Sequence, residues 1–199
     1  MYNFRLLTRA SSTRFREQGS AAVQLLSRSV LLVAVLVVLG ACGEGGSGNS
    51  ATPKPYTVGT KARFGTGGNG AAFLTSGWSS PEAGHTWSDK LSAVVTLGME
   101  PSTEPLLLRM QLRGLSKAPE LPSQPVEVLA NGTKIADWEV ADEAEHTAEI
   151  PAELVRAGGA LNIELKIPKA TTPKQLGLGN DERVLGVSLQ TLQIDRAAH

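Results

Sequence analysis

The chain has 199 residues, enough for one ordinary domain and an appendage, and its 19 basic residues equal its 19 acidic ones. Charged residues make up 19% and aromatic residues 5%, while glycine (21) and proline (11) are plentiful, which excludes a coiled coil and a charge-rich disordered chain. A single cysteine excludes a disulfide framework and a cysteine-built zinc site within one chain. The balanced charge gives no basic excess, so we expect no nucleic-acid partner.

The N-terminal segment has the pattern of an export signal. Residues 1–29 carry five arginines and one acid, residues 30–39 form an unbroken apolar run, and the small residues Gly40 and Ala41 follow. The apolar run is too short to span a bilayer, which takes roughly 20 residues. The pattern therefore predicts a secretory signal peptide over residues 1–41.

A lone cysteine follows this segment directly, in the sequence Leu39-Gly40-Ala41-Cys42. This sequence resembles the lipobox of bacterial lipoproteins. The resemblance implies cleavage before Cys42, a lipid on its sulfur and further acyl groups, such as palmitate, on the new amino terminus. Several acyl chains together anchor a protein stably to a membrane. We therefore expect a bacterial cell-envelope protein, at the outer membrane or the periplasmic face in a Gram-negative cell. The alternative is an ordinary signal peptide or an uncleaved anchor with a coincidental cysteine.

Residues 42–55 combine this cysteine with glycine, serine and proline, which predicts a flexible tether. Such a segment reaches on the order of 20 Å. Removing the five arginines and the one acid of the signal from the totals leaves 14 basic and 18 acidic residues, a net charge of −4. This charge disfavours binding to polyanions and to acidic lipid surfaces.

From Tyr56 onward the hydrophobic period is two, which predicts strands. The alternation is clearest in four segments: residues 93–97, 106–112, 161–167 and 185–194. In the last of these the phase changes after Leu189, which predicts a β-bulge near Gln190. Alternation with one polar face indicates antiparallel sheets rather than βαβ units.

The dipeptide Asn131-Gly132 separates two further apolar runs, residues 126–130 and 133–138. Asn-Gly favours a type I′ turn, which needs positive φ at both central residues, so these runs are predicted to form a hairpin. Residues 137–149 hold six acidic side chains, which we interpret as a solvated sheet edge and a hairpin tip.

Only one segment, residues 151–157, has helical signals, with Pro151 at its start and Gly158-Gly159 after its end. Many short strands, turns rich in glycine and proline, and almost no helix are typical of a sandwich. We therefore predict an all-β fold over residues 56–199: an antiparallel β-sandwich with at most one short helix.

Three patches carry a resemblance to a known family: residues 73–88, 126–132 and 173–186. Their pattern is Gly-Trp, a nearby Glu, a second Trp, a central Asn-Gly hairpin and a late Asp-x-Arg-x-Leu-Gly. This pattern resembles the jelly-roll module appended to many bacterial glycosyltransferases and sugar-phosphate transferases of surface-polysaccharide assembly. The resemblance implies a carbohydrate-binding-module-like jelly roll without catalysis. Because the module stands alone here, no direct role in glycosyl transfer is expected. The positions that match are Trp78, Glu82, Trp87, Asp181 and Arg183.

Each of these residues has two interpretations. Trp78 and Trp87, which fall in a loop before the first clear strand, are either stacking platforms for sugar rings or plugs for the end of the sandwich. Glu82 and Arg183 are expected to form a buried ion pair, with Asp181 as a further acceptor. That pair either holds the long loop of residues 168–183 against the loop that carries Trp78 and Trp87, or provides a polar floor for a sugar hydroxyl or carboxylate.

We expect no catalysis and no cofactor or metal. His85 lies near Glu82 in sequence, but no nucleophile motif accompanies it. Residues 180–182 could supply oxygen ligands to calcium, but no further acidic residues accompany them at short spacing. The glycine-rich residues 65–70 lack the Lys-Ser/Thr ending of a phosphate-binding loop. The predicted function is a non-catalytic envelope lipoprotein that binds a cell-surface glycan or polysaccharide-assembly machinery. The alternative is a structural or protein-docking lipoprotein without a glycan ligand.

Overall fold

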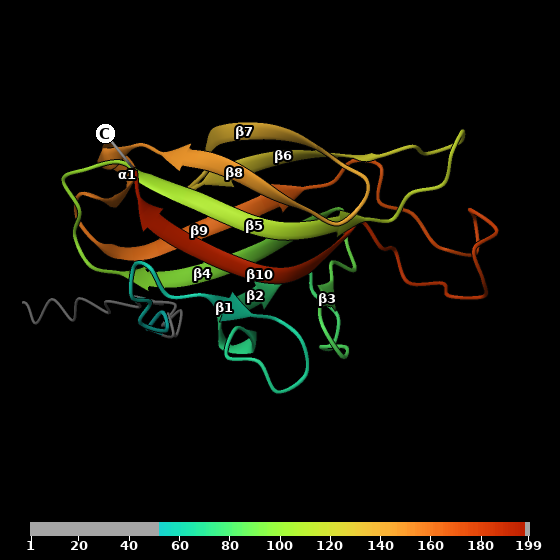
Figure 1. Cartoon of the computed structure of the whole chain (residues 1–199), viewed down its shortest axis with the longest axis horizontal. Coiled ribbons are helices and arrows are strands. Elements are labelled where there is room, and N and C mark those ends of the chain that lie inside the picture. The colour runs from blue at the N-terminus through green and yellow to red at the C-terminus, as the bar shows by residue number, and fades with distance from the viewer. Residues whose placement is uncertain (1–51, 198–199) are drawn as a thin grey trace, which may run out of the picture. The chain divides into compact units, whose positions relative to one another are not determined.

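The computed structural model describes residues 52–197, so the predicted signal peptide and Cys42 lie outside the described residues. The described part is a sandwich of two antiparallel sheets of five strands each (Figure 1). The first sheet has the order β2 (Leu74–Ser76), β4 (Ser92–Met99), β9 (Gly159–Lys166), β6 (Gln124–Ala130) and β7 (Thr133–Val140). The second sheet has the order β1 (Ala62–Arg63), β10 (Val187–Arg196), β5 (Leu106–Gly114) and β8 (Ala144–Ile150), and β3 (Thr86–Trp87) also pairs with β10.

The strand order is that of a jelly roll. From β3 to β10, successive strands alternate between the two sheets, except where the β6–β7 hairpin stays in one. The result is one sheet ordered β3–β10–β5–β8 facing another ordered β4–β9–β6–β7, which is the double Greek-key arrangement of that fold. The predicted antiparallel β-sandwich is therefore confirmed.

The core lies between the sheets and is built by the alternation seen in the sequence. In β4 every second residue is buried, and β5 and β9 repeat the pattern. Leu97, Leu108, Ile163 and Leu189 are among the fully buried side chains. Burying each such side chain contributes roughly 1.5–3 kcal/mol, so this alternation provides the main driving force for the fold.

The predicted turn, bulge and helix are present. Asn131 and Gly132 have φ of 47° and 81°, and the β10–β5 register shifts between Leu189 and Thr191. The helix α1 (Ala152–Val155) is shorter than predicted, since it ends at Val155, and the positive φ of Gly158 and Gly159 follows after two intervening residues. A 3₁₀ turn, η1 (Ala71–Phe73), precedes β2.

Four strands differ from the sequence interpretation. The acidic stretch expected to be a solvated edge and hairpin tip contains all of the edge strand β8 except its last residue, and only Ala148 and Ile150 of this strand are buried. Strands β1, β2 and β3 have two or three residues each, too few to show a period of two. Trp87 consequently belongs to β3 rather than to a loop.

Residues 54–64, named the strap here, connect the two sheets along one side of the sandwich. At the first sheet, the Tyr56 amide donates to the Gly98 carbonyl (2.8 Å), and the Gly98 amide donates to the Lys54 carbonyl (2.7 Å). At the second sheet, the Ile194 amide donates to the Tyr56 hydroxyl at 2.8 Å. The Tyr56 hydroxyl itself donates to the Thr60 carbonyl, so the ring is fixed between β4 and β10.

The sandwich has two distinct ends. The strap begins beside Gly98, where β4 ends and β10 also ends. At the opposite end, named the loop end here, lie the start of β10, the start of β4 and the long loop of residues 167–186 (Figure 1). The described chain therefore enters the sandwich at one end, while most of the predicted site residues lie at the other.

Candidate functional site

The loop of residues 77–88 is a rigid frame held by backbone hydrogen bonds. The Ser79 amide donates to the Trp87 carbonyl (2.9 Å), and the Glu82 amide donates to the His85 carbonyl (2.8 Å). A second segment supports the turn, because the Thr66 amide donates to the Glu82 carbonyl (2.7 Å). The side chain of Glu82 is thus presented from a backbone whose position is fixed on both sides.

Two buried hydroxyl groups fasten this loop to the sandwich. The Thr86 hydroxyl donates to the Phe64 carbonyl at 2.5 Å. The Ser88 hydroxyl accepts from the Val187 amide at 3.0 Å. Both side chains are completely buried, and a buried polar group without a partner would cost free energy. These partnered hydroxyls therefore help to hold this loop against the strap and against the start of β10.

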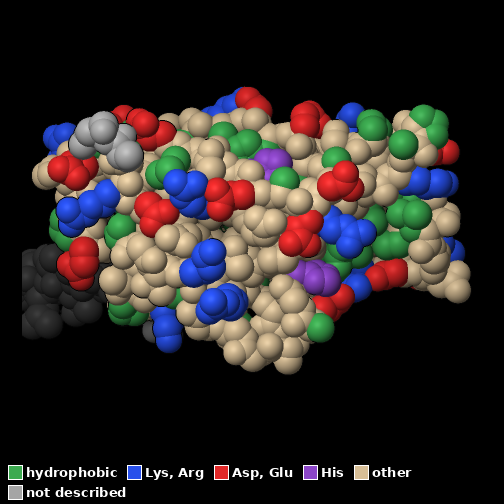
Figure 2. Space-filling view, viewed as in Figure 1, with side chains coloured by type: hydrophobic (Ala, Val, Ile, Leu, Met, Phe, Trp, Pro, Cys, Tyr) green, Lys and Arg blue, Asp and Glu red, His purple; other side chains and the backbone are tan. Residues whose placement is uncertain are grey.

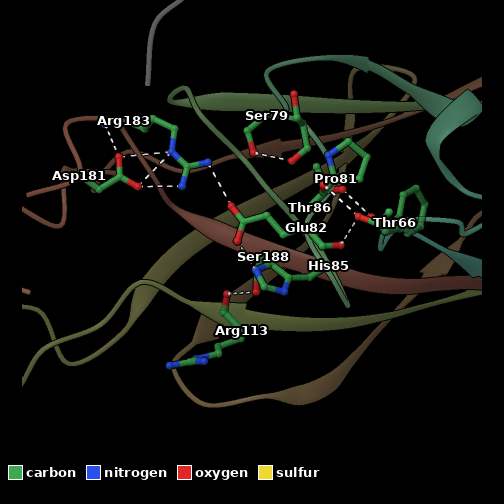
Figure 3. A network of polar contacts seen from close by, with 12 residues as sticks. Thr66, Ser79, Pro81, Glu82, His85, Thr86, Arg113, Asp181, Arg183 and Ser188 are labelled. Atoms are coloured by element: carbon green, nitrogen blue, oxygen red, sulfur yellow. Dashed lines mark hydrogen bonds and ion pairs between the residues drawn. The ribbon is translucent and has the colours of Figure 1, made fainter. Parts of the chain in front are cut away.

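Glu82, Asp181 and Arg183 form one ion cluster at the loop end (Figure 3). Nη1 of Arg183 lies 3.2 Å from Oε1 of Glu82, and Nη2 lies 2.7 Å from Oδ2 of Asp181. Nε of Arg183 donates to the same Asp181 carboxylate at 3.0 Å. Loops that are 101 residues apart in sequence are joined in this way.

The pairing of Glu82 with Arg183 was predicted, but the prediction that it is buried is wrong. The side chains of Glu82, Asp181 and Arg183 are 41%, 34% and 43% exposed. The reason is that both loops extend past the ends of the strands, where no second layer of the sandwich covers them. Because these side chains are exposed, a ligand can reach the cluster. Exposed ion pairs contribute little to stability, so the cluster is not a core element.

Within the cluster, Asp181 and Arg183 shift each other's pKa. Hydrogen bonds from Arg183 lower the pKa of Asp181, and the Asp181 carboxylate raises the pKa of Arg183. Because the folded pKa of Asp181 lies below its ordinary value, its stabilising effect is complete above that value, about 3.9, and is lost as pH falls through the lowered pKa.

We expect Arg183→Gln to return the pKa of Asp181 toward its ordinary value, because the hydrogen bonds that favour the carboxylate are removed. Carboxyl-detected NMR titration measures this shift. Lys174→Gln is the matched control, since Lys174 pairs with the neighbouring Glu182, and it should leave the Asp181 titration unchanged. An unchanged Asp181 pKa in Arg183→Gln would contradict the geometry of the cluster.

His85 and Trp87 extend the cluster onto the second sheet. Nε2 of His85 lies 3.4 Å from Oε2 of Glu82, without the alignment of a hydrogen bond. The His85 ring meets the Trp87 ring edge-to-face, with centroids 5.7 Å apart and planes at 88°. Asp181, Arg183, Glu82, His85 and Trp87 therefore form one continuous, partly exposed surface.

Trp78 has different surroundings. Its Nε1 donates to the Val94 carbonyl of β4 at 2.8 Å, and its ring packs against the hydrophobic core. Its exposed edge lines a small hollow of about 110 Å³ with β2 residues such as Thr75. Within the described residues, no ring contact joins Trp78 to Trp87. Trp78 therefore fits the plug interpretation, and Trp87 is the ring that accompanies the ion cluster.

The approach of His85 to Glu82 brings together two groups of the kind used in acid–base catalysis. The ring nitrogen that faces Glu82 is covered, however, and within residues 52–197 no serine hydroxyl hydrogen-bonds to His85. The same part of the chain contains no group of three or more metal-ligating side chains. It also contains no helix long and apolar enough to cross a bilayer.

Comparison with known proteins gives similarity at the level of fold. No family model matches the chain, and no curated protein sequence matches it. Among solved structures, a family 35 carbohydrate-binding module from Paenibacillus barcinonensis has 10% identity and a TM-score of 0.39, covering 70% of this chain and 100% of that one. The C-terminal family 6 module of a laminarinase from Zobellia galactanivorans has 8% identity and a TM-score of 0.41, covering 69% and 98%. A family 36 module in complex with calcium and xylotriose has 9% identity and a TM-score of 0.37, covering 68% and 99%.

Proposed function

We propose that this chain is a non-catalytic, lipid-anchored protein of the bacterial cell envelope that binds a glycan through the loop end. The observation that carries the proposal is the exposed Glu82–Asp181–Arg183 cluster, which continues without interruption to the half-buried ring of Trp87. An aromatic ring beside a few fixed polar groups is the usual lining of a small-ligand site.

The chemistry of this surface suits a sugar. The face of an indole ring packs against the C–H face of a pyranose, and carboxylate oxygens accept hydrogen bonds from its hydroxyl groups. Oε1 of Glu82 is held by Arg183, whereas Oε2 has no aligned hydrogen-bond donor among the described residues. The frame around Glu82 is already ordered by backbone hydrogen bonds, which reduces the entropy lost on binding.

The position of the surface also suits an anchored binding protein. The strap enters at the end of the sandwich opposite to the loop end. In a protein anchored at Cys42, the tether would therefore attach away from Trp87 and Glu82. The binding surface would be directed away from the membrane, where the glycans of the envelope are accessible.

The test is glycan-array binding by the purified full chain in detergent. We expect Trp87→Ala and Glu82→Gln each to weaken binding at least about tenfold, because a stacked ring and a charge-assisted hydrogen bond each contribute more than 1 kcal/mol. Glu153→Gln on α1, at the other end of the sandwich, is the matched control. Absence of binding to any glycan, or unchanged binding by Trp87→Ala with an unchanged melting temperature, would refute the proposal.

A second candidate, docking of an envelope protein, is favoured by one observation. Among the described residues, three large apolar side chains are exposed to solvent: Leu91 (57%), Leu178 (49%) and Val184 (37%). All three lie in loops at the loop end, and exposed apolar side chains that lie together mark interaction sites. If this surface docks an envelope protein, Leu178→Asp should abolish crosslinking of the chain to that protein and leave glycan binding unchanged.

A further inference from the structure

The outer face of the second sheet carries a row of side chains that begins at Trp87. In the strand register, Trp87 on β3 pairs with Ser188 on β10, and Ser188 pairs with Arg113 on β5. The Ser188 side chain is almost completely covered, while Arg113 is exposed. Trp87 and Arg113 therefore flank the same position of β10 on the same face of the sheet.

A second row beside it begins at another exposed arginine. Arg63 on β1 pairs with Thr191 on β10, and Thr191 pairs with Gln111 on β5. Ala62 is buried and Arg63 is exposed, so the Arg63 side chain also points to the outer face. Figure 2, which views this face, shows basic side chains gathered over β1.

These two arginines differ from the third arginine on the face. Arg109 is neutralised twice, by Glu145 at 2.9 Å and by Asp195 at 3.1 Å. Among residues 52–197, neither Arg63 nor Arg113 has a carboxylate within ion-pair distance. Their guanidinium groups are therefore free to form the bidentate hydrogen bonds that arginine makes with carboxylate or phosphate.

The spacing of the three groups fits an extended ligand. Arg63 and Arg113 lie on strands that flank β10, so their backbones are two strand spacings apart across the sheet, about 10 Å. Their rows are also two β5 residues apart, which adds an offset of about 7 Å along the strands. Trp87 lies on the same side of β10 as Arg63. A chain of sugar units that stacks on Trp87 would thus pass one free guanidinium on each side.

We propose that this face binds an anionic glycan, with its carboxylate or phosphate groups at Arg63 and Arg113 and a sugar ring on Trp87. The inference rests on the proposed function and specifies its ligand class. It also limits the earlier expectation that the net negative charge disfavours binding to polyanions. Although residues 43–199 carry a net charge of −4, charges farther away than about 8 Å are largely screened in physiological salt, so the local arginines determine which ligand binds.

The test compares matched oligosaccharides that are neutral, carry a uronic carboxylate, or carry a phosphate, with polyphosphate as an anion without sugar. We expect the purified full chain to bind at least one acidic oligosaccharide about tenfold more tightly than the neutral one and than polyphosphate. Arg113→Gln and Arg63→Gln should each reduce this preference, and the double variant should abolish it. Arg156→Gln, an exposed arginine beside α1, should leave it unchanged.

The outcomes separate the two proposals. Equal binding of neutral and acidic oligosaccharides, a preference that survives in the double variant, or equally tight binding of polyphosphate would overturn the inference and leave glycan binding by the protein intact. Absence of binding to every oligosaccharide would overturn the proposed function and this inference with it. Whether the carboxylate or the phosphate form binds more tightly identifies the acidic group.

Discussion

Replacing Gly77 with alanine is expected to cost about 3 kcal/mol or more of the free energy of unfolding. Gly77 connects β2 to Trp78 with φ of 74°, a conformation that costs a non-glycine residue roughly 1–2 kcal/mol. An added Cβ would also lie 2.0 Å from the Ser92 carbonyl oxygen, a backbone atom of β4. Since β4 is a central strand of the first sheet, relief of this contact would have to displace the turn that carries Trp78.

Gly132 provides a matched control for this prediction. Its φ is 81°, nearly that of Gly77, but an added Cβ would meet no atom within 4 Å. Gly132→Ala should therefore show the conformational cost alone, about 1–2 kcal/mol. Urea denaturation of the full chain, followed by tryptophan fluorescence, measures both variants. Equal losses at the two positions would show that the close approach at Gly77 has no energetic effect.

Tyr56→Ala is expected to destabilise the sandwich by about 3–5 kcal/mol, as truncation of a large buried ring does. Tyr56 is only 4% exposed and packs edge-to-face against Phe73. Tyr56→Phe keeps the ring and removes the hydroxyl, so it leaves the Ile194 amide without its acceptor and should cost about 1–3 kcal/mol.

Hydrogen exchange gives this prediction a local measurement. In Tyr56→Phe, the Ile194 amide should exchange faster, while the Leu108 amide in the middle of β5 should change only with global stability. If Tyr56→Phe leaves both the Ile194 exchange rate and the stability unchanged, the hydroxyl does not connect the strap to β10.

The sequence was sufficient for the long strands because their burial is one-sided. Leu106 to Leu112 alternates inward and outward in the structure as it does in the sequence. The Asn131-Gly132 turn and the bulge after Leu189 were also predictable, because each depends on local backbone chemistry. Strand β8 was missed because its outer residues are acidic and only two of its side chains are buried. Strands β1 and β3 exist only through their pairing with β10, which is a tertiary contact.

The sequence predicted which residues belong to the ion cluster, but not how exposed they are or how the two tryptophans are placed. The pairing of Arg183 with Glu82 follows from opposite charge, but its exposure depends on how far two loops extend beyond the sheets. The separation of Trp78 from Trp87 depends on which sheet each residue joins. Whether Arg63 and Arg113 have a carboxylate partner depends on which side chains the strand register places beside them. No local pattern in the sequence predicts this register.

The strap has a mechanical consequence for a protein held at Cys42. Strand β1 runs antiparallel to β10 and away from the point where the chain enters. Residues 54–56, however, run parallel to β4, and the chain reverses at the turn of residues 57–60 before it enters β1. A pull on residue 52 therefore loads the backbone hydrogen bonds to Gly98 before it reaches those to Ile194 and Gln190. Tension between a membrane and a surface polymer would thus act on β4 in the first sheet before it acts on β10 in the second.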